Sequence, residues 1–451
     1  MKARKNRREF LVCMAGTLAS SAFCTSSQAL APSPPDYQLE ISPLRLEIAP
    51  RKTIATVAYN GQVPGPLIRW PENKPIRIQV TNRSDVPEIV HWHGLFTPSE
   101  MDGSMEQGSP MIPPGATFVY EFTPRPAGFR WYHTHSFAGH NLKRGLYTGQ
   151  FGCFYLLSKR DPGNYDQELF LTLHDWNAYM AGGGDASMDA AYDYATINDR
   201  MRGHGEPIRV AEGEHILLHL LNASATMTHW AALSGHQMQV MAMDGNPVPN
   251  PASVPAVRLA PAERLDLLVV MDRPGVWVLG ETRKELRTAG MGVVVEYANR
   301  SSPAEWINPP ENAWAYARFA DAATQGRNAD EQIPMVFQSK FAGHGDFDHW
   351  TINGKSFPHT DTVRLQQGKR YRLLMTNRSM DAHPIHLHRH NFEVTNLAGK
   401  SLSGLQKDVV IIEAGATSSV DFTADNPGMT LFHCHQQTHM DFGFMTLFAY
   451  K

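Results

Sequence analysis

Residues 213–224 read Gly-Glu-His-Ile-Leu-Leu-His-Leu-Leu-Asn-Ala-Ser, a pattern typical of a half-buried strand that ends in a turn. Two other stretches follow the same plan. Residues 73–84 read Asn-Lys-Pro-Ile-Arg-Ile-Gln-Val-Thr-Asn-Arg-Ser, and residues 368–379 read Gly-Lys-Arg-Tyr-Arg-Leu-Leu-Met-Thr-Asn-Arg-Ser. The turn asparagines Asn82, Asn222 and Asn377 lie 140 and then 155 residues apart. Repeats of this length indicate whole domains rather than the short units of a solenoid.

Shorter repeated signals flank each copy. An asparagine turn precedes each copy, at Asn60-Gly61, Asn198-Asp199 and Asn353-Gly354. A proline turn followed by another strand pattern comes after each copy, at Pro126-Ala127-Gly128, Pro274-Gly275 and Pro427-Gly428. Strand patterns recur along the chain, while long stretches with helical period are scarce. The sequence therefore predicts an all-β protein of three consecutive Greek-key β-sandwich domains.

The repeats predict the domain limits. We place the three domains at residues 36–160, 161–305 and 331–451, with a linker at 306–330 that is rich in Ala, Pro and Asn. Residues 181–202, which include three consecutive glycines, are predicted to form a long loop.

Composition excludes several classes of protein. The chain has 451 residues, of which 42% are hydrophobic and 19% charged, so it can bury large cores and is not disordered. Its formal net charge is −3, which argues against a nucleic-acid binder held by broad electrostatics. Beyond the N-terminus no apolar run is long enough to cross a bilayer, so no membrane span is predicted.

The first 31 residues predict an export signal. Basic residues precede a mildly apolar stretch at 10–23, and Ala29-Leu30-Ala31 resembles a cleavage site. Residues 6–11 read Asn-Arg-Arg-Glu-Phe-Leu and resemble a twin-arginine signal, which predicts export to the periplasm. An ordinary secretory signal is the alternative, and it also exports the protein. Removal of the signal leaves only Cys153 and Cys434, so the mature chain allows at most one disulfide.

Ten of the 21 histidines fall in four clusters. The clusters are His91-Trp92-His93-Gly94, His133-Thr134-His135-Ser136, His383-Pro384-Ile385-His386-Leu387-His388, and His433-Cys434-His435 with His439. All four lie in the first and third repeats. The second repeat has Trp277-Val278-Leu279 where the others have His-x-His, so the second domain looks like a spacer without the site.

Strand geometry indicates what these clusters do. Residues two apart on a strand share a face, so the four His-x-His pairs present eight imidazoles, enough for three ions of copper, zinc, iron or nickel. Cys434 stands between His433 and His435 and must point the other way. With His383 and His439 it completes two histidines and one cysteine, the ligand set of a blue-copper site.

The order H-W-H-G, H-x-H-S, H-P-x-H-L-H and H-C-H-x3-H resembles the copper signatures of the multicopper oxidases, the family of laccases, cuprous oxidases and ferroxidases. The resemblance covers essentially the whole mature chain. It implies cupredoxin-like domains, four copper ions per chain (one type 1, one type 2 and two type 3), and oxidation of a one-electron donor coupled to reduction of dioxygen to water. A copper nitrite reductase fits poorly, because those chains are shorter and lack the full set of cluster histidines.

The resemblance also implies a role for each ligand, with the cluster between the first and third domains. The implied ligands are His383, Cys434 and His439 for type 1; His91 and His386 for type 2; and His93, His133 and His435, with His135, His388 and His433, for the type 3 pair. His439 is the implied point at which electrons enter, and Cys434 passes them on.

Several positions depart from the family pattern. Phe444 occupies the family's axial position, where phenylalanine cannot coordinate copper. Met445, one residue later, is the alternative axial residue, and strand alternation favours Phe444 because it places Met445 on the other face. Arg389 stands where the family usually has Gly, and the sequence offers no functional account of it. Asp102 matches the family's acid beside the cluster and is a candidate proton donor, although Asp-Gly can also be a simple turn. The second acid of the family is missing, with Asp441 as the nearest substitute.

The reducing substrate is the least determined part. The 20 methionines are scattered without a dense Met-x-x-Met segment, which favours a laccase-like oxidase of phenols or aromatic amines over a cuprous oxidase. Oxidation of Cu(I), Mn(II) or Fe(II) is the alternative, and a non-enzymatic exported scaffold on the same fold is a more distant one. The predicted partners are dioxygen and a small reducing substrate, and the sequence does not predict the oligomeric state. The other histidines, such as His174, His229 and His344, and also Cys153, are expected to be structural.

Overall fold

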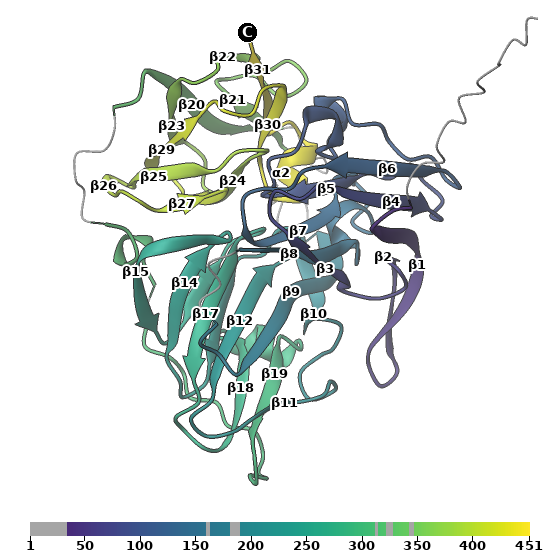
Figure 1. Ribbon diagram of the computed structural model, residues 1–451, viewed down its shortest axis with the longest axis vertical. Coiled ribbons are helices and arrows are strands. Elements are labelled where there is room, and N and C mark those ends of the chain that lie inside the picture. Colours follow the sequence, from purple (N-terminus) through teal and green to yellow (C-terminus); the bar gives the residue numbers. More distant parts are fainter. Residues whose placement is uncertain (1–33, 159–162, 181–189, 312–313, 322–327, 342–346) are drawn as a thin grey trace, which may run out of the picture. The chain divides into compact units, whose positions relative to one another are not determined.

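The computed structural model of the chain describes residues 34–158, 163–180, 190–311, 314–321, 328–341 and 347–451 (Figure 1). The predicted export signal at 1–31, the three glycines at 182–184 and His344 lie outside these ranges. Among the described residues, no helix is both long enough and apolar enough to span a membrane.

The predicted fold class is confirmed: strands dominate, and the sheets pack in pairs along the chain. Each copy of the repeated stretch forms an interior strand of one sheet, namely β4 (Ile76–Asn82), β12 (His215–Asn222) and β23 (Arg370–Asn377). Each copy pairs in parallel with one neighbour and antiparallel with the other. The sequence repeat is therefore a repeat of topology.

The first sandwich consists of two four-stranded sheets, in the orders β2-β1-β4-β6 and β3-β8-β7-β5. Ile78 from one sheet and Trp92 and Phe154 from the other share an apolar core. Besides β4, its strands are β1 (Tyr37–Ala49), β2 (Lys52–Tyr59), β3 (Gly65–Pro71), β5 (Val90–His93), β6 (Thr117–Phe122), β7 (Gly128–Thr134) and β8 (Phe151–Leu157).

The second sandwich pairs the sheets β10-β9-β12-β17-β14-β15 and β11-β19-β18-β13-β16. The predicted loop at 181–202 is wrong for residues 190–197, which form edge strand β10 paired with β9. Apolar and aromatic residues there suit a strand, and the glycine run concealed that signal. Besides β12, the strands are β9 (Gln167–Met180), β10 (Ala190–Ile197), β11 (Ile208–Val210), β13 (His229–Leu233), β14 (Met238–Met243), β15 (Asn246–Val254), β16 (Val257–Leu259), β17 (Arg264–Val270), β18 (Val276–Glu281) and β19 (Gly292–Tyr297).

The third sandwich pairs a sheet ordered β21-β20-β23-β29-β25-β26, with β27 also on β25, against the sheet β22-β31-β30-β24-β28. Besides β23, its strands are β20 (Glu331–Lys340), β21 (His349–Ile352), β22 (Val363–Leu365), β24 (His383–Leu387), β25 (Phe392–Leu397), β26 (Lys400–Ser401), β27 (Gln406–Lys407), β28 (Val409–Ile412), β29 (Thr417–Thr423), β30 (Met429–Cys434) and β31 (Met445–Tyr450). Within the residues that the structure describes, the helices are short: η1 (Ser99–Met101), η2 (Met105–Gln107), η3 (Gly145–Tyr147), α1 (Lys284–Thr288), η4 (Tyr316–Arg318) and α2 (Gln437–Asp441).

The turn asparagines make the same contacts in all three sandwiches. Each side-chain amide donates to a carbonyl four or five residues further on and to a second carbonyl across the sandwich, and each side-chain oxygen accepts from the backbone N–H two residues later. The carbonyl acceptors are Val86 and Ile112 for Asn82, Met227 and Leu259 for Asn222, and Asp381 and Ile412 for Asn377, at 2.7–3.2 Å. These buried amides explain why asparagine recurs at this position.

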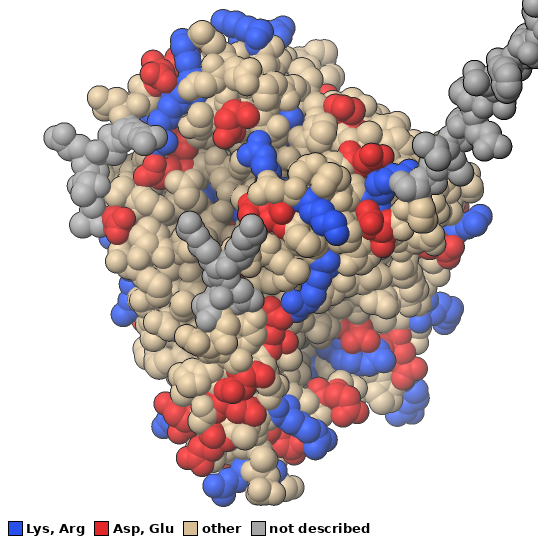
Figure 2. Space-filling model, viewed as in Figure 1, with Lys and Arg blue, Asp and Glu red and all other residues tan. Residues whose placement is uncertain are grey.

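The sandwiches share cores. One apolar cluster joins the second and third sandwiches and includes Tyr316 and Phe319 from the segment predicted as a linker. A second cluster joins the first and second sandwiches. On the face shown in Figure 2, Lys and Arg are interspersed with Asp and Glu, so the described residues form no broad basic patch there.

The second sandwich buries a charged histidine. His229 has no exposed surface, and its ring nitrogens lie 2.8 Å from a carboxylate oxygen of Asp175 and 3.0 Å from one of Glu281. Burial alone would lower the pKa of His229, but the two carboxylates outweigh it and raise the pKa to about 9. His229 is therefore a structural imidazolium, as expected for a histidine outside the four clusters.

We expect this ion triad to stabilise the fold at neutral pH and to lose its effect as the pH rises from about 6.5, the pKa of an unfolded histidine, to about 9. The free energy of unfolding of the wild type relative to His229→Gln should fall by roughly 3 kcal/mol across that range. Chemical unfolding at several pH values measures the difference. The exposed His204→Gln is the control and should follow the wild type at every pH. A pH-independent difference for His229→Gln would contradict the assignment.

Candidate metal centre

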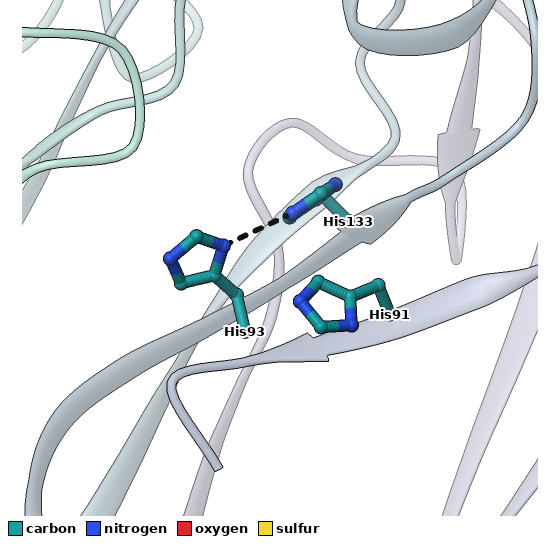
Figure 3. A group of neighbouring side chains, drawn as sticks. All are labelled: His91, His93 and His133. Carbon is teal, nitrogen blue, oxygen red and sulfur yellow. Dashed lines mark hydrogen bonds between the residues drawn. The ribbon is translucent and has the colours of Figure 1, made fainter. Parts of the chain in front are cut away.

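The structure brings the eight predicted histidines together between the first and third sandwiches. They come from β5 and β7 of the first sandwich, from β24 and β30 of the third, and from residues just beyond the ends of these strands. His91 faces His133 across β5 and β7, and His386 faces His433 across β24 and β30. Figure 3 shows His91 and His93 projecting from one strand towards the same region as His133 of the neighbouring strand. Seven of the eight side chains are buried, and His135 is partly buried.

The ring nitrogens are spaced closely enough to share ions. The Nε2 atoms of His388 and His433 lie 3.0 Å apart, and Nδ1 of His93 lies 3.4 Å from Nε2 of His133. Three buried triads have ligand atoms within 4.8 Å of one another: His135/His388/His433, His91/His93/His133 and His91/His386/His388. The first triad matches one predicted type 3 set, while the other two cut across the predicted sets because His91 lies near the centre of the group. His435 completes the ring, with its imidazole centroid 5.1 Å from that of His93.

In five of the eight rings, a hydrogen bond fixes which nitrogen is free. A carbonyl oxygen can only accept, so an Nδ1 atom bonded to it must carry the proton, and the Nε2 lone pair of the neutral ring is left for a metal. The accepting carbonyls belong to Asp102 for His91, Thr134 for His133, Asp408 for His386 and Cys434 for His433, at 2.7–2.9 Å. His93 is reversed: its Nε2 lies 3.2 Å from a carboxylate oxygen of Asp408, which leaves Nδ1 facing the cluster.

A second group lies on the other side of β30. The Cys434 sulfur is 3.7 Å from Nδ1 of His383 and 3.6 Å from Nδ1 of His439, and these two nitrogens are 3.1 Å apart. Burial lowers the pKa of both imidazoles, to about 3 for His383, and raises that of the Cys434 thiol. The triad thus offers two neutral nitrogens and a sulfur, while the neighbouring His433 and His435 contact the eight-histidine cluster.

Phe444 lies beside this triad. Its ring centroid is 4.8 Å from that of His383, and it packs in the same apolar core as Cys434. Met445 packs instead with Leu431 and Met440 in a separate apolar cluster. Strand alternation therefore gives the two residues different neighbours, with the phenyl ring on the side of the triad.

Three sequence profiles described as multicopper oxidase match residues 41–160, 167–296 and 330–451. Multicopper oxidase MmcO of Mycobacterium tuberculosis is 30% identical over 440 residues, which cover 88% of this chain and 83% of that protein.

The chain belongs to the multicopper oxidase family. It is a copper-dependent oxidoreductase with dioxygen as the electron acceptor and a reducing substrate as the donor. Copper resistance protein A of Pseudomonas syringae pv. tomato is 24% identical over 611 residues, an alignment that covers 98% of this chain and 98% of that protein. The crystal structure of a multi-copper oxidase from Pseudomonas Thermotolerans superimposes with a TM-score of 0.73 at 26% identity, covering 92% of this chain and 98% of that one.

The donor atoms of the oxidase fit copper. Within the described part of the chain, Nε2 of His91, His135 and His386 and both ring nitrogens of His435 are buried without a hydrogen-bond partner. Buried polar atoms are rarely left unpaired in proteins, so these nitrogens point to an ion as their missing partner. Neutral imidazoles together with one cysteine sulfur are the ligands that copper sites use.

Asp102 lies against the cluster from the first sandwich. One carboxylate oxygen accepts from Thr97 Oγ1 at 2.6 Å, and the other accepts from Gln107 at 2.8 Å and from Nδ1 of His388 at 2.7 Å. Its backbone carbonyl holds His91, as described above. Burial raises the pKa of the carboxyl group. Asp102 is therefore more than a turn residue, because it contacts cluster histidines from two sandwiches.

The structure also places Asp441, the nearest substitute for the family's second acid, and the neighbouring histidine of the third cluster, His390. Asp441 accepts backbone N–H groups of Ala138 and Gly139 at 2.9 and 2.8 Å and the Gln437 amide at 2.8 Å, and burial raises its pKa to about 7. His390 contacts the carbonyl of His388 and the hydroxyl of Tyr450. Neither side chain belongs to a ligand triad of the described residues.

The sequence reasoning missed Asp408, which contacts two of the eight histidines. No motif marks it. The available signal was a charged pair, Lys407-Asp408, directly before the wholly apolar strand β28, a position where charged side chains are buried only with partners.

Arg389 now has a structural explanation. Its backbone has φ +59°, in the left-handed region that favours glycine, and its side chain is buried. The guanidinium donates to the carbonyls of Thr97 (2.8 Å), Met429 (2.8 Å) and Pro427 (2.7 Å) and to the hydroxyl of Thr430 (3.0 Å). Arg389 thereby joins the first sandwich to the third beside His388.

Replacing Arg389 with glycine sets two effects against each other. Glycine relieves about 1 kcal/mol of strain at positive φ, whereas each lost bond from a charged donor costs about 1.5–3 kcal/mol. We expect Arg389→Gly to destabilise the protein by roughly 3 kcal/mol or more, measured by chemical unfolding. The matched control is Arg51→Gly, since Arg51 also has positive φ (+63°) but is exposed, and this variant should be neutral or slightly stabilising. Equal effects of the two substitutions would contradict the role of the buried guanidinium.

Proposed function

We propose that this oxidase couples one-electron oxidation of a laccase-type substrate, a phenol or an aromatic amine, to four-electron reduction of dioxygen to water. The observation that carries the proposal is the arrangement at residues 433–435. The sulfur of Cys434 faces two histidine nitrogens on one side of the segment, and His433 and His435 face the eight-histidine cluster on the other.

The proposed ligands are those the family pattern implies. His383, Cys434 and His439 would hold the type 1 ion, and His91 with His386 the type 2 ion. The type 3 pair would be held by His93, His133 and His435 and by His135, His388 and His433. Bound copper supplies one-electron redox chemistry at the cysteine site and dioxygen reduction at the cluster.

The protein's own residues connect and feed these sites. The backbone from Cys434 to His433 and His435 is a short covalent link between the two ligand groups. Asp102, hydrogen-bonded to His388, is the proposed source of protons at the cluster, which water formation consumes. Electrons are proposed to enter at His439, whose imidazole packs against Trp350 with ring centroids 4.0 Å apart.

A metal substrate is the second candidate. The name of the relative Copper resistance protein A points towards copper chemistry in the cell. Two methionines favour a soft metal donor: Met105 is 62% exposed on the loop that also carries Met101 and Met111, and Met380, three residues before His383, is 91% exposed. These thioethers favour Cu(I) among the metal donors, and Mn(II) and Fe(II) are the other metal alternatives.

The organisation predicted from the sequence forms part of the proposal. We keep the domain limits 36–160, 161–305 and 331–451 with a linker at 306–330, and export of the mature chain to the periplasm by the twin-arginine route. The sheet pairs and the three matched profiles support the first, and the residues at 6–11 support the second.

Oxygen uptake by the copper-loaded protein tests the reaction directly. A phenol, Cu(I) and Mn(II) are supplied side by side, and we expect the phenol to give the fastest uptake. Faster uptake with Cu(I) or Mn(II) would select the metal-oxidase alternative, and a protein that binds no copper would be a scaffold.

Cys434→Ser should abolish uptake with every donor together with the blue thiolate absorption. Cys153→Ala, at the other buried free cysteine, should retain both.

The axial position can be tested by supplying a ligand there. A thioether coordinated to a blue-copper site lowers its reduction potential, so Phe444→Met should lower the potential of the cysteine-bound copper. Spectroelectrochemical titration of the blue band measures this change. Met445→Leu should leave the potential unchanged, and a larger effect of Met445→Leu than of Phe444→Met would show that the sulfur of Met445 already approaches the metal.

A further inference from the structure

Asp408 holds two of the proposed ligands at once. Its carboxylate lies 3.2 Å from Nε2 of His93, and its backbone carbonyl accepts from Nδ1 of His386 at 2.7 Å. The two imidazoles stack with centroids 3.8 Å apart and an interplanar angle of 12°. Because His93 comes from the first sandwich and His386 from the third, the orientation of Asp408 determines how two ligands from different sandwiches face the cluster.

The second sandwich fixes that orientation. Arg264, the first residue of β17, donates from Nη1 and Nη2 to the two carboxylate oxygens of Asp408, both at 2.6 Å. Arg130, on β7 of the first sandwich, approaches one of the same oxygens at 3.4 Å. All three side chains have no exposed surface. A guanidinium is a planar fork that matches a carboxylate in one orientation, so this contact sets a direction as well as neutralising a charge.

Asp244 of the second sandwich holds the main chain on both sides of the contact between Arg264 and Asp408. Its carboxylate accepts the backbone N–H of Arg264 at 3.0 Å and those of Asp408 and Val409 at 3.2 and 3.1 Å. Nζ of Lys407 lies 3.0 Å from Asp244 and 3.0 Å from Glu263. The main chain and the side chain of Asp408 are thus both anchored to the sandwich that contributes none of the proposed ligands.

We propose that Arg264 is a positioning residue for the copper cluster, acting through Asp408 on His93 and His386. The second sandwich then contributes to the metal centre, in addition to separating the first and third sandwiches along the chain. This inference rests on the proposed assignment of His93 and His386 as copper ligands.

The test is Arg264→Lys in the full-length, copper-loaded protein, since lysine keeps the charge but loses the fork. Removing a partner that orients a metal ligand typically weakens metal affinity 10- to 100-fold. We expect the copper-loaded variant to keep the blue absorption of the Cys434 site, which Arg264 does not contact. Its affinity for the three cluster ions should fall 10- to 100-fold, with an altered electron paramagnetic resonance signal of the type 2 ion.

Two comparisons separate this role from general stability. His229→Gln removes another buried charge of the second sandwich, so it should leave the affinity for cluster copper and the resonance signal as in the wild type. If Arg264→Lys fails to fold, Asp408→Asn, which weakens the same fork from the other side, is measured in its place with the same expected loss. A folded variant at either position with wild-type cluster copper and signal would overturn the inference. Failure of the wild type itself to bind copper would instead overturn the proposed function.

Discussion

The alternation of side chains along one extended segment organises the metal centre. Successive residues of a strand point to opposite faces, so His433 and His435 reach the cluster while Cys434 reaches His383 and His439. The two groups of proposed ligands cannot move independently, because the three consecutive residues 433–435 supply members of both groups. The pairing of β24 with β30 extends this constraint, since it sets His386 opposite His433.

Burying these imidazoles costs free energy unless the N–H group and the lone pair of each ring have partners. Burial lowers the pKa of the cluster histidines, so the rings are neutral and have one N–H and one lone pair each. Backbone carbonyls accept the N–H groups of His91, His133, His386 and His433, and the lone pairs converge. The fold therefore prepares the ligand atoms with hydrogen bonds that already exist in the protein, and these bonds restrict ring rotation as well as the tautomer.

Local patterns made most of this predictable. Asparagine turns spaced at domain length predicted the three sandwiches, and His-x-His pairs predicted which side chains share a face, because both depend on neighbours in sequence. The contacts missed join distant residues: His93 and Asp408 are 315 positions apart, and Arg389 and Thr97 are 292 apart. Local sequence patterns carry no signal for the pairing of residues so far apart in the chain. Strand β10 was missed for a different reason: three glycines nearby in the sequence indicated a loop more strongly than the short stretch at 190–197 indicated a strand.

The second sandwich shows why a repeat can lose its ligands and still serve the site. Its β18 carries Trp277 and Leu279 in the core where the other copies carry histidines, so this strand supplies none of the proposed copper ligands. Its Asp244 and Arg264 nevertheless sit against Asp408, between ligands of the other two sandwiches. A buried carboxylate beside uncharged imidazoles needs a cation. Arg130 of the first sandwich approaches one oxygen of Asp408 at 3.4 Å, whereas Arg264 of the second sandwich contacts both oxygens at 2.6 Å. The second sandwich supplies this arginine without supplying a proposed copper ligand, which is the way we infer that it contributes to the metal centre.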